Sequence, residues 1–252
     1  MSDLAAIAAL LDGAAREARA VPQLEAPLGL DDAYAVQALA LRRRQARGER
    51  VVGMKMGFTS RAKMVQMGLS DMIFGRLTDA MAVEDGGSTP HAAYIHPRVE
   101  PEIAFLLGRR LAGRVSHLEA LAAVEAVAPA IEIIDSRYRD FRFSLPDVIA
   151  DNASSSGFVI GAARRPDLDL TNLGMALWVD GRLCEVGSSA AILGNPWRSL
   201  TAAARFAERH GFELRPGDIV LAGGATAAVP AGKGAEVMLE TQGLAQVVFR
   251  FD

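Results

Sequence analysis

Two apolar, β-branched segments, residues 99–105 and 129–135, contain glutamates at positions where buried strands are expected. Glu100 and Glu102 are two residues apart, so a strand places both carboxylates on one face. Glu132 lies in the second segment, which we expect to form a neighbouring strand. Three inward carboxylates repel one another unless a cation lies among them, and an all-oxygen set favours Mg²⁺ or Mn²⁺ over zinc. The alternative is a pair of amphipathic strands whose glutamates face solvent. The isoleucines around Glu132 favour the metal site.

Lys55 lies inside another apolar segment, residues 51–57. The chain strongly prefers arginine, since only three of its 27 basic residues are lysines. An ammonium is a compact charge whose pKa burial lowers, whereas a guanidinium stays protonated. We therefore expect Lys55 to perform a task that arginine cannot. The alternative is an edge lysine that reaches solvent.

The composition restricts the class of protein. A chain of 252 residues, half of them hydrophobic, is long enough for one large domain or two small ones. A net charge of −3 gives no electrostatic basis for nucleic-acid binding, and no apolar run reaches membrane-spanning length. The single cysteine, Cys184, excludes an internal disulfide, and Met1-Ser2-Asp3 lacks the cationic start of a signal peptide. These features predict a soluble cytoplasmic protein without nucleic-acid or membrane partners.

The element pattern predicts an α+β fold. Residues 1–50 are expected to form a helical N-terminal cap, with helices at 3–20 and 31–47. Residues 51–252 are expected to form a β-rich catalytic domain, because strand patterns predominate there. Asp180-Gly181, between two strand-like runs, predicts a hairpin. The other expected helices are 61–67, 118–127 and 197–209, and the expected strands are 51–56, 98–107, 130–135, 157–161, 174–180, 182–186, 219–222, 236–241 and 246–251. This pattern favours a mixed, mainly antiparallel β core.

Several sequence blocks, in this order over almost the whole chain, resemble one enzyme family. They are GMKMGFTS (53–60), FGRLTD (74–79), VEPEIAF (99–105), IEIIDSR (131–137), ADNASS (150–155) and GDIVLAGG (217–224). Together they resemble the fumarylacetoacetate hydrolase superfamily. Within it, the chain is similar to the branch of hydratases and decarboxylases from the meta-cleavage degradation of aromatic compounds. The resemblance implies a mainly antiparallel mixed β core of the fumarylacetoacetate hydrolase type.

The resemblance also implies a Mg²⁺ or Mn²⁺ ion held by Glu100, Glu102 and Glu132. The substrates of the family are 2-oxo acids, which chelate the ion through the carboxylate and the neighbouring oxo oxygen. Asp135, three residues after Glu132, is a possible third ligand by position. On a strand it would face the opposite side, so Glu132 is preferred.

Further site residues follow from the same resemblance. Lys55 is expected to stabilise enolate charge or to transfer a proton, with Asp79 as its partner or as a base. Asp79 is equally suited to capping a turn. Ser155 is expected to donate hydrogen bonds to the substrate carboxylate, unless its serine cluster is an ordinary loop, and Leu77 is expected to contact the substrate. Arg61 is expected to orient a distal carboxylate, unless it is a surface charge.

Sequence details favour decarboxylation within this branch. The family's hydrolases carry a second lysine after the third metal ligand, whereas this chain has no lysine from Met64 to Gly232. The basic segment with Arg61 and Lys63 suits a small 2-oxo dicarboxylic acid. The expected reaction is metal-dependent decarboxylation of 2-oxohex-3-enedioate to 2-hydroxypenta-2,4-dienoate and CO₂. The alternatives are hydration of 2-hydroxypenta-2,4-dienoate and, less favoured, a non-catalytic partner subunit. We expect a homo-oligomer, or a complex with the pathway hydratase.

Overall fold

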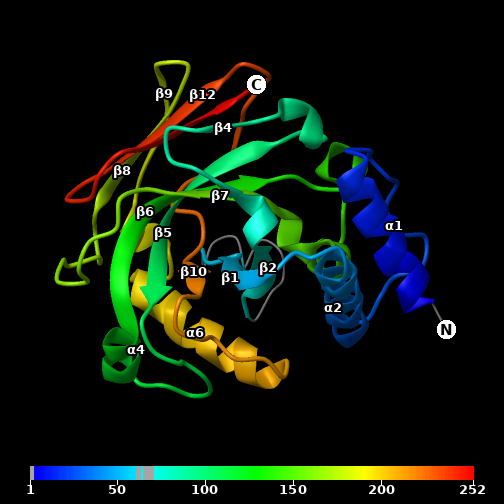
Figure 1. Cartoon of the computed structure of the whole chain (residues 1–252), viewed down its shortest axis with the longest axis horizontal. Coiled ribbons are helices and arrows are strands. Elements are labelled where there is room, and N and C mark those ends of the chain that lie inside the picture. Colours follow the sequence, from blue (N-terminus) through cyan, green and yellow to red (C-terminus); the bar gives the residue numbers. More distant parts are fainter. Residues whose placement is uncertain (1–2, 61–63, 65–70) are drawn as a thin grey trace.

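The computed structural model describes residues 3–60, 64 and 71–252, which form two β-sheets with helices around them (Figure 1). The strands of the larger sheet are β1 (Val51–Gly57), β2 (Ile73–Thr78), β3 (Ala82–Val83), β5 (Arg98–Leu107), β6 (Val124–Ile134), β7 (Ser155–Ile160), β10 (Ile219–Leu221) and β11 (Val229–Pro230). Their order is β2-β1-β10-β5-β6-β7-β3, and β11 pairs with β5. The β1–β10 and β3–β7 pairs are parallel, whereas the remaining pairs described in this sheet are antiparallel. The predicted mixed, mainly antiparallel core is confirmed.

The smaller sheet lies on the opposite side of the molecule from the N-terminal helices (Figure 1). Its strands follow the order β4 (Ser88–Thr89), β13 (Val247–Phe251), β12 (Glu236–Thr241), β8 (Gly174–Val179) and β9 (Arg182–Ser188). The β8–β9 hairpin turns at Asp180 and Gly181, whose φ angles are 52° and 70°. Two consecutive positive φ values suit the twist of a two-residue hairpin, so the predicted hairpin is confirmed.

The α-helices with described bounds are α1 (Leu4–Arg16), α2 (Leu30–Ala46), α4 (His117–Ala123), α5 (Leu145–Ala150) and α6 (Pro196–Arg209). Asp3 begins α1 by accepting hydrogen bonds from two backbone N–H groups of the first turn. This helix ends at Arg16, earlier than expected, and Ala18 then takes a positive φ of 45°. The two N-terminal helices pack on each other and share a hydrophobic cluster with Tyr138 and Ile149 of the β-rich part. No helix in the described part of the chain is both long and apolar enough to cross a bilayer.

The expected helix at 118–127 is wrong in its second half. Ser116 and Glu119 form a capping box that starts α4, but the helix ends at Ala123 and β6 begins at Val124. Val124 and Val127 pair with β5, opposite Leu107 and Phe105. Pairing with a long buried strand therefore outweighs the local helical pattern. The expected helix at 61–67 lies outside the described residues, apart from residue 64.

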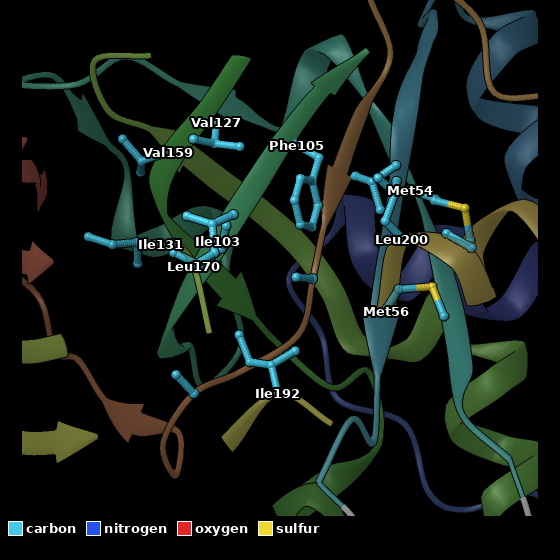
Figure 2. Packing of buried hydrophobic residues seen from close by; sticks show 14 of the residues in the cluster. Met54, Met56, Ile103, Phe105, Val127, Ile131, Val159, Leu170, Ile192 and Leu200 are labelled. Carbon is cyan, nitrogen blue, oxygen red and sulfur yellow. The ribbon is translucent and has the colours of Figure 1, made fainter. Parts of the chain in front are cut away.

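The alternation of β5 and β6 divides their side chains between two faces of the larger sheet. Ile103, Phe105, Val127 and Ile131 point into the main hydrophobic core, where they meet α6 and the smaller sheet (Figure 2). The opposite face carries the small residues Ala104, Ala128 and Ala130, and the glutamates. Strands β2 and β7 are contacting neighbours in space although they lie near opposite ends of the strand order. The sheet is therefore curled, and this second face is concave. The small side chains leave room on it for a site.

Candidate metal centre

The concave face brings the three predicted glutamates together. Glu100 on β5 lies directly opposite Glu132 on β6, and Glu102 follows on the same face, opposite Ala130. One carboxylate oxygen from each glutamate can be chosen so that all three lie within 4.8 Å of one another. Glu102 and Glu132 are fully buried, and Glu100 is half-buried. The geometry therefore allows one small cation to contact all three carboxylates.

Lys55 reaches the same cluster from β1. Its Nζ atom donates a hydrogen bond of 3.1 Å to Oε2 of Glu132, and the lysine itself is buried. The parallel pairing of β1 with β10 places Lys55 opposite Leu221, which in turn lies opposite Ala104 of β5. The interpretation of Lys55 as an edge lysine reaching solvent is wrong, because the side chain points into the concave face.

A glycine pair after β10 supports the glutamates. The backbone N–H of Gly223 donates a hydrogen bond of 2.6 Å to Oε2 of Glu102. Gly223 has φ +110°, and a Cβ atom there would lie 2.1 Å from the hydroxyl oxygen of Thr59. A Cβ atom on Gly224 would lie 2.9 Å from Oε2 of Glu100. Both positions bring the backbone close to a side chain of the site, and the positive φ of Gly223 favours glycine there.

The electrostatics of the cluster call for more positive charge than Lys55 supplies. Burial raises the pKa of Glu102 well above its usual range, and the neighbouring charge of Glu132 raises it further. Burial also raises the pKa of Glu132, while Lys55 opposes this shift. Three ionised glutamates and one ammonium would leave a net negative charge in a buried site, which is costly without a further cation.

Two buried carboxylate oxygens show whether the residues present fit a metal ion. Oε1 of Glu102 and Oε1 of Glu132 are inaccessible to solvent and have no hydrogen-bond donor among the described residues. Buried carboxylate oxygens normally have a partner, so these two atoms are suited to coordinate an ion. An all-carboxylate donor set without histidine or cysteine suits hard divalent cations such as Mg²⁺, Mn²⁺ or Ca²⁺. The residues present therefore fit such a metal.

A cavity of about 110 Å³ adjoins the cluster. Lys55, Glu100, Gly224 and Ser154 form part of its polar lining. Its apolar lining includes Phe58, Ile73, Ile134, Phe141, Phe143 and Val148. A ligand in this cavity would have one end beside the carboxylates and the rest against apolar and aromatic side chains.

Ser155 and Leu77 both lie near the cluster, in different ways. Ser155 begins β7, and its buried hydroxyl makes no hydrogen bond of regular geometry in the described part of the chain. It is nevertheless close enough to Glu132 to lower the pKa of that carboxyl. Leu77 faces the same side of the sheet as Lys55 but is fully buried in an apolar cluster with Phe158. Its side chain packs in the floor of the concave face and does not line the cavity.

The structure does not bring Asp79 to the cluster. Its carboxylate accepts hydrogen bonds of 2.9 Å from both the backbone N–H and Nε of Arg50, and another of 3.0 Å from the backbone of Ala80. Arg50 lies five residues before Lys55, about 16 Å along an extended strand. This corrects the expectation that Asp79 partners Lys55, because strand pairing carries it to the other end of β1, where it caps a turn. The expected substrate contact of Arg61, with its alternative Lys63, lies outside the described residues.

Asp135, the alternative third ligand, lies outside the glutamate cluster and makes other hydrogen bonds, in agreement with the preference for Glu132. It follows the end of β6 and accepts hydrogen bonds of 2.8 Å from the backbone N–H groups of both Ile95 and His96.

A larger cavity of about 270 Å³ lies between the helical cap and the sheet. Its charged lining residues include Asp12, paired with Arg47, and Arg137, paired with Asp151. These groups already pair with one another, and among the described residues no group of potential metal ligands comparable to the three glutamates lies in this cavity.

Sequence reasoning assigned no definite role to several residues of the site. Gly223-Gly224 is one of two glycine-rich turns in the sequence that could line a pocket, and its position directly after a buried strand is a signal that the backbone there approaches something closely. Ser154 and Phe141 also line the cavity. No local pattern marks these two residues, because they reach the site through the loop between β6 and β7.

The curled mixed sheet and its acidic cluster define a class of protein in which three glutamates on one concave face fit a divalent metal ion. The chain belongs to the fumarylacetoacetate hydrolase family, since the model described as "Fumarylacetoacetate (FAA) hydrolase C-terminal" matches residues 50–252.

Three relatives illustrate the similarity. The chain is 59% identical to a 4-oxalocrotonate decarboxylase of a Pseudomonas species over 245 residues, 96% of each chain. It is 40% identical to a 2-keto-4-pentenoate hydratase of Paraburkholderia xenovorans over 199 residues, 78% of this chain and 74% of the relative. Among solved structures, it resembles the 4-oxalocrotonate decarboxylase from Pseudomonas putida G7 complexed with magnesium and adipate, with a TM-score of 0.94 and 36% identity. That match covers 99% of this chain and 97% of the other.

Proposed function

We propose that this protein is a metal-dependent decarboxylase that converts 2-oxohex-3-enedioate to 2-hydroxypenta-2,4-dienoate and CO₂. The observation that carries the proposal is the buried cluster of Glu100, Glu102, Glu132 and Lys55 beside a largely apolar cavity. Two further points support it. The relative with 59% identity is named for this activity, and the similar structure holds magnesium and adipate, a six-carbon dicarboxylate like the proposed substrate.

We propose Mg²⁺ as the ion, with Mn²⁺ as the alternative, and the three glutamates as its ligands. When bound, the ion would supply Lewis-acid stabilisation of the negative charge that develops on the C2 oxygen of the substrate. The free oxygens of Glu102 and Glu132 and a carboxylate oxygen of Glu100 are the atoms available to hold it.

The chain's own residues account for the remaining requirements of the reaction. As the C5–C6 bond breaks and CO₂ leaves, the electron pair of that bond moves through the conjugated chain to the C2 oxygen. Lys55 either donates a charge-assisted hydrogen bond to that oxygen or transfers to it the proton that converts the dienolate to the dienol product. Ser155 donates a hydrogen bond to the C1 carboxylate. The apolar lining limits water at the carbon chain, which strengthens these polar interactions.

A product assay tests the proposal directly. Purified protein is mixed with Mg²⁺ and 2-oxohex-3-enedioate, and CO₂ release and loss of substrate absorbance are followed, with EDTA as the control. We expect CO₂ release that stops when EDTA removes the metal. Absence of CO₂ together with water addition to 2-hydroxypenta-2,4-dienoate in a parallel cuvette would replace the decarboxylase by the hydratase and leave the metal site intact. Absence of both reactions and of Mg²⁺ binding would support a non-catalytic subunit.

A further inference from the structure

The short segment before Ser155 has an unusual backbone. Asn152, Ala153 and Ser154, which form the turn η4 (Asn152–Ser154), have φ angles of 53°, 52° and 59°. Residues with a Cβ atom are unfavourable in the left-handed region, and three in succession are rare. Such a conformation persists only where the surrounding contacts impose it, and it is often found at functional sites.

Contacts from β2 hold the first residue of this turn. Oδ1 of Asn152 accepts a hydrogen bond of 2.7 Å from the backbone N–H of Arg76, and Nδ2 donates one of 3.0 Å to the Arg76 carbonyl. The side-chain amide thus pairs with the backbone of β2 as a neighbouring strand would. A Cβ atom on Gly75 would lie 2.4 Å from the Asn152 carbonyl oxygen, so the close approach depends on glycine at that position.

A buried ion pair holds both ends of the turn. Arg137 is buried, and its Nε and backbone N–H donate to the carboxylate of Asp151, which directly precedes the turn. Its Nη2 donates to the Asp151 carbonyl, and its Nη1 donates to the hydroxyl of Ser156, beyond the turn. The carbonyl of Ser154 accepts a hydrogen bond of 2.8 Å from the backbone of Asp135. One guanidinium therefore fixes the chain on each side of the left-handed residues.

The turn presents one buried hydroxyl group at the candidate cavity. The hydroxyl of Ser154 is inaccessible to solvent and has no hydrogen-bond partner among the described residues. Ser154 lines the cavity that Lys55 and Glu100 also line, whereas Ser155 lines the larger cavity beside the helical cap. A buried hydroxyl without a partner is unfavourable, and a bound anionic ligand would supply an acceptor for Ser154.

We propose that the left-handed turn is a rigid holder that presents the hydroxyl of Ser154 to the carboxylate of a 2-oxo acid. In this arrangement Ser154 is a second substrate-binding residue, and Arg137 and Asn152 are positioning residues that act through Ser154. The inference rests on the proposed function, because it takes the ligand class from that proposal. It adds the residues that fix the geometry of binding and assigns a role to an ion pair outside the metal cluster.

The test uses 2-oxoadipate as the probe, since it has both carboxylates and the 2-oxo group but lacks the C3–C4 double bond, through which the electron pair of the C5–C6 bond would reach the C2 oxygen. Calorimetric titration of the whole protein, at saturating Mg²⁺, gives the dissociation constant of the probe, and a separate titration gives that of Mg²⁺ alone. For Ser154→Ala we expect probe binding weaker by about tenfold, the effect of one lost hydrogen bond to a charged group. The dissociation constant of Mg²⁺ should change less than about twofold, since the metal's ligands are intact.

Arg137→Lys and Asn152→Ala test the positioning role. Each should weaken probe binding by about as much as Ser154→Ala, because each lets the turn relax and withdraw the Ser154 hydroxyl. The double variant Arg137→Lys/Ser154→Ala should be little worse than the single variants, since both changes remove the same interaction. Effects that multiply in the double variant would overturn the positioning role. Unchanged probe binding in Ser154→Ala would overturn the binding role.

A matched control separates positioning from general stability. Arg47 forms a two-pronged ion pair with Asp12 in the helical cap, with both distances 2.7 Å. Arg47→Lys should lower the melting temperature while leaving probe binding unchanged. If Arg137→Lys does not fold, Asn152→Ala and its double variant with Ser154→Ala decide the same question. If the wild-type protein neither binds the probe nor releases CO₂ from the substrate, the proposed function fails as well. If it does both while the turn variants bind normally, only this inference fails.

Discussion

Replacing Glu102 by glutamine separates metal binding from folding. The carboxylate is fully buried, one oxygen accepts the Gly223 N–H, and the other has no donor in the described part of the chain. Glutamine keeps an oxygen for Gly223 and places an amide N–H₂ group where the free oxygen was. That group can donate to a neighbouring glutamate. We therefore expect Glu102→Gln to stabilise the metal-free protein and to weaken metal binding.

The magnitude follows from the spacing of the carboxylates. At 4.8 Å, the upper limit of the separation between the chosen carboxylate oxygens, two unit charges repel by about 3.5 kcal/mol at an effective dielectric constant of about 20. Lys55 attracts Glu102 and offsets part of this repulsion, so we expect a net gain of about 1–3 kcal/mol in the free energy of unfolding. The repulsion exists only when Glu102 is ionised, and its raised pKa means that ionisation occurs at a higher pH than for an ordinary glutamate. The gain from Glu102→Gln should therefore increase with pH. Mg²⁺ affinity should fall at least about a hundredfold, the upper end of the losses measured for residues that only support a ligand.

Urea unfolding in EDTA at two pH values, followed by tryptophan fluorescence, measures the first effect, and calorimetric titration with Mg²⁺ measures the second. Glu240→Gln is the matched control, because Glu240 lies on the smaller sheet and bonds to Trp178 and Gln246. It should leave Mg²⁺ binding unchanged. The reasoning would be refuted if Glu102→Gln bound Mg²⁺ like the wild type, or if it destabilised the metal-free protein at alkaline pH.

Three further predictions follow from the same cluster. Lys55→Met should lower kcat by about 10²–10⁴-fold while Mg²⁺ affinity is kept or increased, because a positive charge beside the ion is removed; steady-state kinetics and calorimetry check this, and full turnover by the folded variant would contradict it. The metal-free protein should lose stability as pH rises, because the pKa values of Glu102 and Glu132 are raised on folding. The stability that such groups contribute is fully present at a pH below their pKa in the unfolded state, and it is lost as the pH rises through their pKa in the folded state. Thermal melts with and without Mg²⁺ should show this loss only in the absence of the metal. Gly223→Ala should cost about 1–3 kcal/mol, because its φ is +110° and a Cβ atom would collide with a threonine hydroxyl. Gly232→Ala, with open space around it, should cost little in the same urea titration.

Much of the fold was predictable from local pattern. The two N-terminal helices, the Asp180-Gly181 hairpin and helix α6 follow from caps, turn residues and periodicity, all of which act within a few residues. The start of β6 was not predictable in this way. Alanine and leucine before Val124 favour a helix locally, and only pairing with β5 extends the strand back to that residue.

The candidate site divides in a similar way. Alternation along one strand is a local property, so the shared face of Glu100 and Glu102 could be predicted from their spacing. The position of Asp79 could not, because it depends on how β2 pairs with β1 and on the partner that Arg50 offers there. The cavity lining of Ser154 and Phe141 likewise depends on the path of a loop.

The sequence by itself determined which residue types could hold a hard divalent cation, which strands carry them, and that a rare lysine lies in an apolar strand. The tertiary structure decided the rest. It set Glu132 opposite Glu100, brought Lys55 to 3.1 Å from Glu132, and left two buried oxygens with no hydrogen-bond donor among the residues that the structure describes. It also imposed the left-handed turn before Ser155, which no local preference favours. The physical reason is that strand register and sheet curvature are set by packing between segments far apart in the chain, whereas alternation and capping are set by neighbours.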